Sequence, residues 1–463
     1  MMHTVCLARS LSALFVAFFI LMGVFVLTGI SCSLNAPSIQ PQVNGLVVAN
    51  RLEKALKVLN SQPHAYGPNN ELLFLLDKGL ILHLAKHYPE SIETLAQAQR
   101  KIDALYTKSL TRIAGSWIYN DYTAPYQGED FEHVLVNVFQ ALNYVGLGQI
   151  GEALVEARDV DSKLNVINSL YPPQQKNVYR EDAFVRFLMG ILYEASGTAE
   201  DINNALISYQ KAAQIYAGDY EPTYRTAVPR FLQENLLSTA QWMGEADFAP
   251  YRKQFPQAGF IPLKEKAQKA EVYLIQYNGL APIKVQTSFP FPLPGGYMNK
   301  VAFPHYSERS YDTKSSRFIA VDRQRRESQE ESELAEPLGA IAVKNLENRR
   351  IRVFVKAALR PTGKYLAERG LERKAQESWG DPSIPWYRSA ASLYNLFSEQ
   401  ADLRSWQTLP DEIRLARLIL NPGEYKLRVD NLNSNRETIE QVDLGTVILK
   451  AGEKKFFFIR TAL

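Results

Sequence analysis

The sequence predicts an α+β protein of more than one domain, with an N-terminal helical-repeat domain and then a mixed α/β domain that ends in a β-sandwich-like part. Three observations support this prediction. The chain has 463 residues, which is more than one ordinary hydrophobic core accommodates. Apolar residues recur at three- and four-residue spacing as far as about Pro256, as in amphipathic helices. Beyond that point, short runs rich in β-branched and aromatic residues alternate with Gly and Pro, as in strands and turns.

The amino end resembles an export signal. Arg9 precedes a predominantly apolar run from Leu11 to Leu27, and small and polar residues follow it. This run is longer than the usual signal core of about 7 to 15 residues, and it reaches the lower limit of about 17 for a membrane-spanning helix. Its length therefore fits either a cleaved signal or an uncleaved anchor.

The stretch "LTGISC", which ends at Cys32, resembles a bacterial lipobox, in which the cysteine is acylated and becomes the first residue of the mature protein. Cleavage of residues 1–31 as a signal peptide would remove Cys6 and leave Cys32 without a disulfide partner, which agrees with lipid attachment. Ser33 stands where an Asp tends to retain enteric lipoproteins at the inner membrane. The resemblance therefore implies palmitate-type lipid on Cys32 and an outer-membrane location facing the periplasm. A plain signal peptide or an uncleaved anchor with an incidental cysteine is the alternative.

Residues 32–49 carry no charged side chain and contain Pro37 and Pro41, so we predict a tether between the lipid and the folded body. Residues 50–265 are predicted to form a helical domain, in which three windows share one pattern of small and large residues. This pattern is typical of tetratricopeptide (TPR) repeats, whose paired helices cross closely at the small residues. An antiparallel helical bundle of another kind is the alternative. The matching positions are Gly79, Leu82, Tyr88, Ser91, Leu95 and Ala98; Ala141, Tyr144, Gly148, Ala153 and Ala157; and Gly190, Tyr193, Gly197, Ala205, Tyr209 and Ala212.

The three windows are spaced more widely than tandem repeats of about 34 residues, so we expect additional helices at residues 100–117 and 160–170. One face of the first helix in each window is apolar, and in a TPR array this face lines the concave groove. We expect the additional helices or the following domain to cover it, with an apolar segment of a partner as the alternative. The residues on this face are Leu73, Leu76 and Leu80; Leu135, Val138 and Leu142; and Phe184, Phe187 and Ile191.

Residues 266–463 are predicted to form the mixed α+β domain. Strands are expected within residues 270–322, helices within 333–400 and a closing set of strands within 411–461. The stretch "NPGEY" in the closing set predicts a tight turn between two strands. The closing set resembles the small β-sandwich modules of envelope proteins.

Motifs for catalysis or cofactor binding are few. Gly146, Gly148 and Gly151 match G-x-G-x-x-G, but this motif follows a helix, which argues against a dinucleotide site. His83 and His87 lie one helical turn apart without a third metal ligand. The net charge of +3 is small for this length and argues against a nucleic-acid partner. We therefore predict no enzyme activity, cofactor, metal or small-molecule substrate, with an envelope hydrolase that has an unrecognised site as the alternative.

Residues 344–374 are strongly basic, with ten Lys or Arg against three Glu. Arg352, Lys356 and Arg360 are spaced four residues apart, which places them on one helical face, and Lys364 follows in "RPTGKY". Such a segment is usually a solvated surface. The functional alternative is contact with anionic lipid, glycan or an acidic partner, for which these four residues are the candidates.

Several stretches of the mature chain resemble a family of bacterial TPR-containing lipoproteins of uncharacterised role, among them "VEARDVDSKL", "EDAFVRFLMGILYEA", "VKAALRPTGKY" and "EQADLRSWQTLP". The resemblance implies a lipid-anchored scaffold of the cell envelope that binds other envelope proteins through its repeats. The recurring motifs include Asp402, Arg404 and Trp406, whose alternative role is to join the two domains. We also expect Glu132 and Arg158 to form an interhelical ion pair with a structural role.

Overall fold

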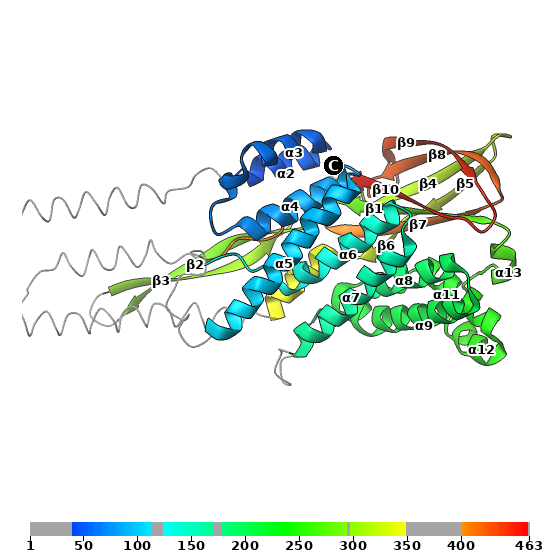
Figure 1. Cartoon of the computed structure of the whole chain (residues 1–463), viewed down its shortest axis with the longest axis horizontal. Coiled ribbons are helices and arrows are strands. Elements are labelled where there is room, and N and C mark those ends of the chain that lie inside the picture. The colour runs from blue at the N-terminus through cyan, green and yellow to red at the C-terminus, as the bar shows by residue number, and fades with distance from the viewer. Residues whose placement is uncertain (1–38, 113–123, 170–177, 294–296, 349–400, 462–463) are drawn as a thin grey trace, which may run out of the picture.

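A computed structural model describes residues 39–112, 124–169, 178–293, 297–348 and 401–461. Within these ranges the protein is α+β, as predicted, because helices occupy the first part of the chain and most strands the second (Figure 1). The helices are α2 (Gln40–Val48), α3 (Leu52–Ser61), the 3-10 helix η1 (Pro63–Tyr66), α4 (Glu71–Leu84), α5 (Tyr88–Arg112), α6 (Asp130–Gly146), α7 (Ile150–Ser169), α8 (Ala183–Ser196), α9 (Ala199–Ile215), the π-helix η3 (Tyr216–Tyr220), α10 (Glu221–Tyr224), α11 (Arg230–Met243), α12 (Glu245–Gln254) and α13 (Leu263–Lys266).

The helices α4 to α9 form three consecutive pairs: α4 with α5, α6 with α7, and α8 with α9 (Figure 1). Two of the predicted small residues lie where paired helices cross. A Cβ atom on Gly79 would lie 2.5 Å from the Leu95 side chain, and one on Gly190 would lie 2.2 Å from the Tyr209 ring. Between α8 and α9 the chain turns at Gly197, whose φ of 76° favours glycine. The small residues therefore permit the close crossing that the sequence pattern predicted.

Part of the predicted tether is a helix. Residues 40–48 form α2, on which Val43 and Val47 are fully buried and Asn44 donates a hydrogen bond to the Gln407 side chain at 2.9 Å. The prediction that residues 32–49 are all tether was therefore wrong for α2. The lack of charge in this stretch reflects burial, because apolar residues of α2 pack on the helical core.

Two further boundaries differ from the predictions. Residues 100–112 continue α5 and residues 160–169 continue α7, so the expected additional helices are extensions of the second helix of a pair. Residues 333–336 were assigned to a helical section but form a strand, because they pair with the strand at 412–420 at the sheet edge. Residues 338–348 are helical, as expected.

The strands form two four-stranded sheets and a separate hairpin. The first sheet has the order β10-β1-β7-β6, the second the order β5-β4-β8-β9, and β2 pairs with β3. In the first sheet β10 is parallel to β1, and the other neighbours are antiparallel. The bounds are β1 (Ala270–Asn278), β2 (Ile283–Leu293), β3 (Tyr297–Ser307), β4 (Ser315–Asp322), β5 (Glu327–Glu331), β6 (Glu333–Glu336), β7 (Glu412–Leu420), β8 (Gly423–Leu432), β9 (Thr438–Leu449) and β10 (Lys454–Thr461).

The predicted β-sandwich combines strands from both predicted strand groups. Residues of β1, β4, β7, β8, β9 and β10 share one core between the two sheets, including Leu274, Phe318 and Leu427. The turn in "NPGEY" joins β7 to β8, as predicted, and thereby carries the chain from one sheet to the other. The first sheet is thus the middle of three layers, with the second sheet on one face and the helices on the other (Figure 1).

Strand β1 is buried at every position because both of its faces are covered. Val272 and Leu274 face the second sheet, whereas Tyr273, Ile275 and Tyr277 belong to the core shared with the helices. The predicted groove residues of α4, α6 and α8 are all buried in this same core. The chain therefore covers this apolar face itself, as expected, and residues of the first sheet belong to the same core.

Candidate functional site: the helix–sheet interface

The helix–sheet interface is where β1, β7 and β10 face α4, α6 and α8. His83 of α4 is buried there, and its ring nitrogens lie 2.6 Å from the Tyr277 hydroxyl and 2.7 Å from Asn143 Oδ1. The rings of Phe139 and Phe458 lie 5.5 and 5.8 Å from the His83 ring. His87 is exposed and contacts Glu53 instead. His83 is therefore a buried interface residue rather than an exposed member of a metal-binding pair.

The segment before β7, residues 401–411, connects the sheet domain to the helices through Trp406. Its ring is 1% exposed and lies 5.8 Å from the Phe139 ring. The Trp406 backbone N–H donates to Glu132 Oε1 at 2.7 Å. Two residues later, the Thr408 hydroxyl donates to buried Asp77 of α4 at 2.7 Å. This segment therefore satisfies two carboxylates that the helices bury.

Arg404 makes the second set of contacts in this segment. It forms a two-point ion pair with Asp402, with nitrogen–oxygen distances of 2.8 and 2.7 Å. Its Nη1 donates to Asn70 Oδ1 and to the Ala124 carbonyl, and its guanidinium lies 5.2 Å from the Tyr126 ring centre. The structure thus brings Asp402, Arg404 and Trp406 together at the interface, where their contacts join the two domains.

Glu132 has different partners from the one expected. It accepts from the Tyr126 hydroxyl at 2.6 Å as well as from Trp406, and burial raises its pKa to about 7, with the charge of Glu129 adding to the effect. Arg158 donates to the Tyr193 hydroxyl at 2.6 Å. The predicted Glu132–Arg158 ion pair was therefore wrong, because the Tyr126 hydroxyl and the Trp406 backbone N–H from the distant sheet domain are the donors to Glu132.

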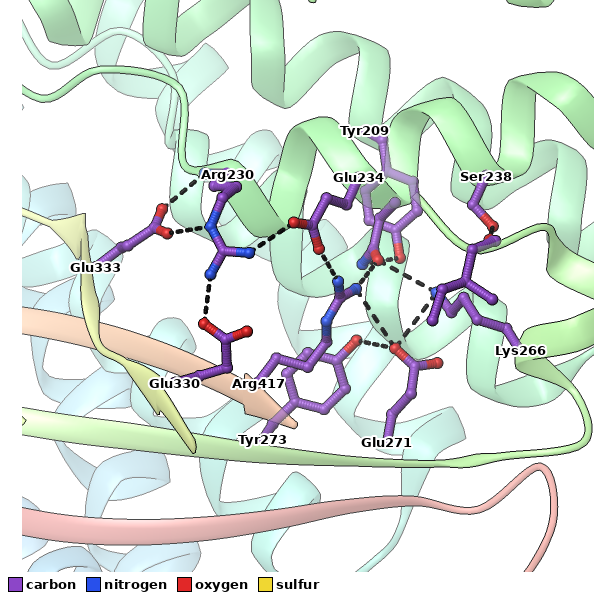
Figure 2. A network of polar contacts seen from close by, with 12 residues as sticks. Tyr209, Arg230, Glu234, Ser238, Lys266, Glu271, Tyr273, Glu330, Glu333 and Arg417 are labelled. Atoms are coloured by element: carbon purple, nitrogen blue, oxygen red, sulfur yellow. Dashed lines mark hydrogen bonds and ion pairs between the residues drawn. The ribbon is translucent and has the colours of Figure 1, made fainter. Parts of the chain in front are cut away.

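A cluster of fully buried ions lies between α8, α11, α13 and the first sheet, and we call it the interface ion cluster. Lys266 Nζ lies 2.6 Å from Glu194 Oε1 and 3.3 Å from Glu271 Oε2. Lys454 contacts the same two carboxylates, and Arg417 contacts Glu271. Each of these side chains is at most 6% exposed. The cluster is completed by Asn235 and by Tyr209, Glu234 and Tyr273, of which Figure 2 shows the last three.

The charges of the interface ion cluster balance only when its members are taken together. Burial alone would raise the pKa of Glu194 and Glu271, but Lys266 and Lys454 outweigh it and hold both pKa values below the ordinary range. Burial lowers the pKa of Lys454, and the two carboxylates reverse that effect and raise it. Glu234 supplies a third carboxylate through its ion pair with Arg417. Three cations therefore face three carboxylates, and of these six side chains only Glu234 is more than 6% exposed, at 16%.

Glu234 also connects the buried cluster to the surface. It pairs with Arg417 on the inside and with Arg230 on the outside, at 2.7 Å, and Arg230 in turn reaches Glu330 at 2.6 Å (Figure 2). Arg230 borders a surface cleft of about 480 Å³ whose other charged residues include Arg225, Glu333 and Arg414. Arg230 and Arg414 are both engaged by carboxylates of the chain, so the cleft presents mixed charge rather than an anion site.

Two buried carboxyl groups, Glu336 of β6 and Asp182, lie close to each other. Burial raises the pKa of Glu336 well above its ordinary range, and Asp182 adds to this effect. Glu336 accepts from the Tyr220 hydroxyl, which the π-helix η3 positions, and Asp182 caps α8 through Val185 N at 2.7 Å. Burial raises the pKa of Asp182 to about 6. Neither Asp182 nor Glu336 lines the surface cleft, so both carboxyl groups lie within the packed core.

Cys32 and the basic residues Arg352, Lys356, Arg360 and Lys364 lie outside the described residues, so their roles stay predictions. Sequence reasoning missed the interface ion cluster because its residues are far apart in the chain. One signal was available: Glu271 and Lys454 each sit at the start of a strongly apolar strand, where an ion needs a partner.

These features define a class of protein: three layers, α/β/β, joined by a buried polar interface. No protein-family model matches the chain, and no curated protein matches it. Among the described residues, no group of three or more His, Cys, Asp or Glu side chains is placed to hold a metal ion. None of the described helices combines the length and apolar character that a membrane span requires.

Proposed function

We propose that the protein is a lipid-anchored scaffold of the bacterial cell envelope, held at the outer membrane through Cys32 and facing the periplasm. The observation that carries the proposal is the lipobox-like stretch "LTGISC", which leaves Cys32 as the single cysteine of the mature chain. Only residues 33–38 separate it from Ile39, where the described structure begins. The folded body would therefore lie close to the bilayer.

We infer further that the three helix pairs are TPR-like repeats, and that partners bind their outer side. The small residues at the helix crossings support the first part of this inference. The second part rests on the burial of the apolar face of α4, α6 and α8, which in a TPR array would line the groove that commonly binds partners. Val155 and Val166 of α7 and Ile207 of α9 are 49, 56 and 51% exposed and lie on the second helices of their pairs. Val155 and Val166 are spaced by about three helical turns and so share a face.

The experiment follows the anchor and the partner in the same cells. Wild type should incorporate labelled palmitate and fractionate with the outer membrane, whereas Cys32→Ala should incorporate none. After in-cell cross-linking, an envelope protein should be recovered with wild type and lost with Val155→Asp/Val166→Asp. Ile448→Asp, which changes a more exposed apolar residue on β9, should recover it normally. Absence of palmitate from wild type would contradict the anchor, and equal recovery by all variants would contradict the partner surface.

A further inference from the structure

Helix α2 has a composition that disfavours a helix. Its nine residues, Gln40–Val48, include Pro41, Gly45 and three valines, and no alanine or charged residue. Glycine and β-branched residues have low helix propensity, and an isolated helix of this length is not stable in water. Ile39 at the amino end makes no side-chain cap, and neither end carries a charge that would complement the helix dipole. Helix α2 is therefore helical only while it packs on the body.

One apolar stripe attaches α2 to the body. Ile39, Val43 and Val47 are spaced four residues apart, so they lie on one side of the helix. Each is at most 7% exposed, and all three belong to the core that the helices share with the first sheet. Burial of this stripe is the main force that holds α2 in place.

Among the described residues, the polar side chains of α2 contribute little to its attachment. Asn44 Nδ2 donates to Gln407 Oε1 at 2.9 Å, but Asn44 Oδ1 is buried without a hydrogen-bond partner in this part of the chain. Gln40 Nε2 donates to Asp77 Oδ2 at 3.4 Å, which is long for a hydrogen bond. Because α2 has no charged residue, no ion pair fixes it. A buried acceptor without a donor is costly, and release of α2 into water removes this cost.

The chain after α2 forms a hinge, and α3 beyond it is a stronger helix. Between Val48 and Leu52, Asn50 adopts a φ of 51°, in the left-handed region that asparagine tolerates better than most residues. The α3 sequence "LEKALKVLNS" is rich in strong helix formers, and its Ala55 and Leu59 are fully buried. Figure 1 shows α2 and α3 together at one margin of the helices. The release of α2 therefore leaves α3 attached.

Release of α2 would lengthen the connection to the lipid anchor. With α2 packed, the stretch from Cys32 to Ile39 spans at most about 24 Å. With α2 released, the free chain runs from Cys32 to Leu52 and spans at most about 70 Å. The packed helix holds its nine residues in a length of about 13 Å. Opening of α2 would thus increase the greatest distance between the body and the bilayer about threefold.

We propose that α2 is a stored part of the tether, a segment that leaves the body as a unit and lengthens the connection between the lipid anchor and α3 while the rest of the protein stays folded. This inference rests on the proposed anchor at Cys32. The short state holds the body against the bilayer. The long state lets the exposed side of α7 and α9 reach partners farther from the membrane.

The first test measures whether α2 opens by itself. The acylated full chain with Val47→Cys is reconstituted in vesicles of phosphatidylethanolamine and phosphatidylglycerol and treated with a maleimide, which reads position 47 because acylation blocks Cys32. Val138→Cys on α6 is the matched control, since Val47 and Val138 are both fully buried. Position 47 should react at least about tenfold faster than position 138, with little dependence on urea, because local opening exposes little surface. Equal rates overturn the proposal.

Hydrogen exchange of the unaltered acylated chain measures the same opening without a substitution in α2. The amides of α2 should exchange at least about tenfold faster than those of α4, again with little dependence on urea. Equal protection of α2 and α4 overturns the proposal, whatever the maleimide shows.

Two substitutions at Gly45 shift the opening in opposite directions. A Cβ atom there meets nothing within 4 Å, so adding Gly45→Ala to Val47→Cys should favour the helix and slow the maleimide reaction about fivefold. Gly151→Ala on α7, where a Cβ atom also meets nothing, should leave the reaction unchanged. Gly45→Pro breaks the helix and should keep α2 released while the body still unfolds cooperatively. Loss of the folded body in Gly45→Pro would show that α2 is a required part of the core and would overturn the proposal.

The last measurement separates the lengthening from the anchor. Energy transfer from a dye on Ile448→Cys, an exposed position of β9, to acceptor dyes on the lipid headgroups reports the distance between the body and the bilayer. Gly45→Pro should show less transfer than Gly45→Ala, and equal transfer overturns the lengthening. Absence of palmitate on Cys32 overturns the anchor and the tether with it, whereas hydrogen exchange still reports whether α2 opens alone.

Discussion

At the residue scale, His83 shows how one buried side chain links the helices to the sheet. Ser91 Oγ donates to the Gly79 carbonyl, so it accepts from the Asn143 amide, and Asn143 Oδ1 is left as an acceptor. His83 Nδ1 therefore carries the proton, and Nε2 accepts from the Tyr277 hydroxyl. Burial lowers the pKa of His83 to about 4, which is consistent with a neutral ring.

This geometry predicts a pH dependence of stability. The folded state keeps His83 neutral down to about pH 4, whereas the unfolded state binds a proton near its ordinary pKa of about 6.5. At His83 the unfolded state binds more protons in this window, so this residue's contribution lowers stability by up to about 3 kcal/mol as pH drops from 6.5 to 4. Urea unfolding of wild type and His83→Gln at several pH values measures it. His83→Gln should be less stable at pH 7.5 and lose less stability on acidification; equal losses would contradict the prediction.

At the element scale, the close crossing of α8 and α9 connects helix pairing to the interface ion cluster. The Tyr209 ring occupies the space over Gly190, and its hydroxyl donates to Glu194 Oε2 at 2.9 Å. Asn235 of α11 donates to the same hydroxyl at 3.1 Å. The ring therefore cannot move away from Gly190 without losing contacts to the cluster.

Gly190→Ala is predicted to destabilise the protein, because the new methyl group would lie 2.2 Å from the Tyr209 ring and such overpacking costs about 1–3 kcal/mol. The gain of up to about 1 kcal/mol that Ala has over Gly in a helix offsets only part of this cost. The matched control is Gly151→Ala on α7, where a Cβ atom meets nothing within 4 Å, and it should be neutral or mildly stabilising. Thermal unfolding of both variants decides the matter, and an equally stable Gly190→Ala would show that α8 and α9 can separate without cost.

At the scale of the whole molecule, the order of helices and strands could be predicted from the sequence because hydrophobic spacing is a local property. The pairing of β1 with β10 could not, because it depends on contacts between residues far apart in the chain. The same limit applies to the candidate site. Trp406 was predicted from its motif, but Glu132 was predicted to pair with Arg158 instead. Local spacing does not reveal that the distant Trp406 backbone N–H donates to Glu132.

The interface ion cluster makes the helices and the first sheet depend on one another, because its residues come from α8, α9, α11 and α13 and from β1, β7 and β10. Lys266 belongs to the connection between the helices and the sheet, and it contacts Glu194 of the helices and Glu271 of β1. A protein held together in this way should unfold as one unit, with helices and sheets lost together. Separate transitions for the two parts would be expected only if the interface contributed little.

Lys266→Met tests this dependence, because Met has a similar length and no charge. It leaves three carboxylates facing two cations, and we expect a loss of about 3–5 kcal/mol, the usual cost of removing one partner of a buried pair. Lys426→Met is the matched control, since Lys426 pairs with Asp443 at 3.0 Å while both side chains are more than half exposed; its loss should stay below about 1 kcal/mol. Urea unfolding is followed by far-ultraviolet circular dichroism and by tryptophan fluorescence, and within each of the three proteins the two probes should give the same midpoint.

Adding Glu194→Gln to Lys266→Met should cost less than the sum of the single changes, because the two side chains contact each other directly. Similar midpoints for Lys266→Met and Lys426→Met would show that the cluster does not hold the layers together.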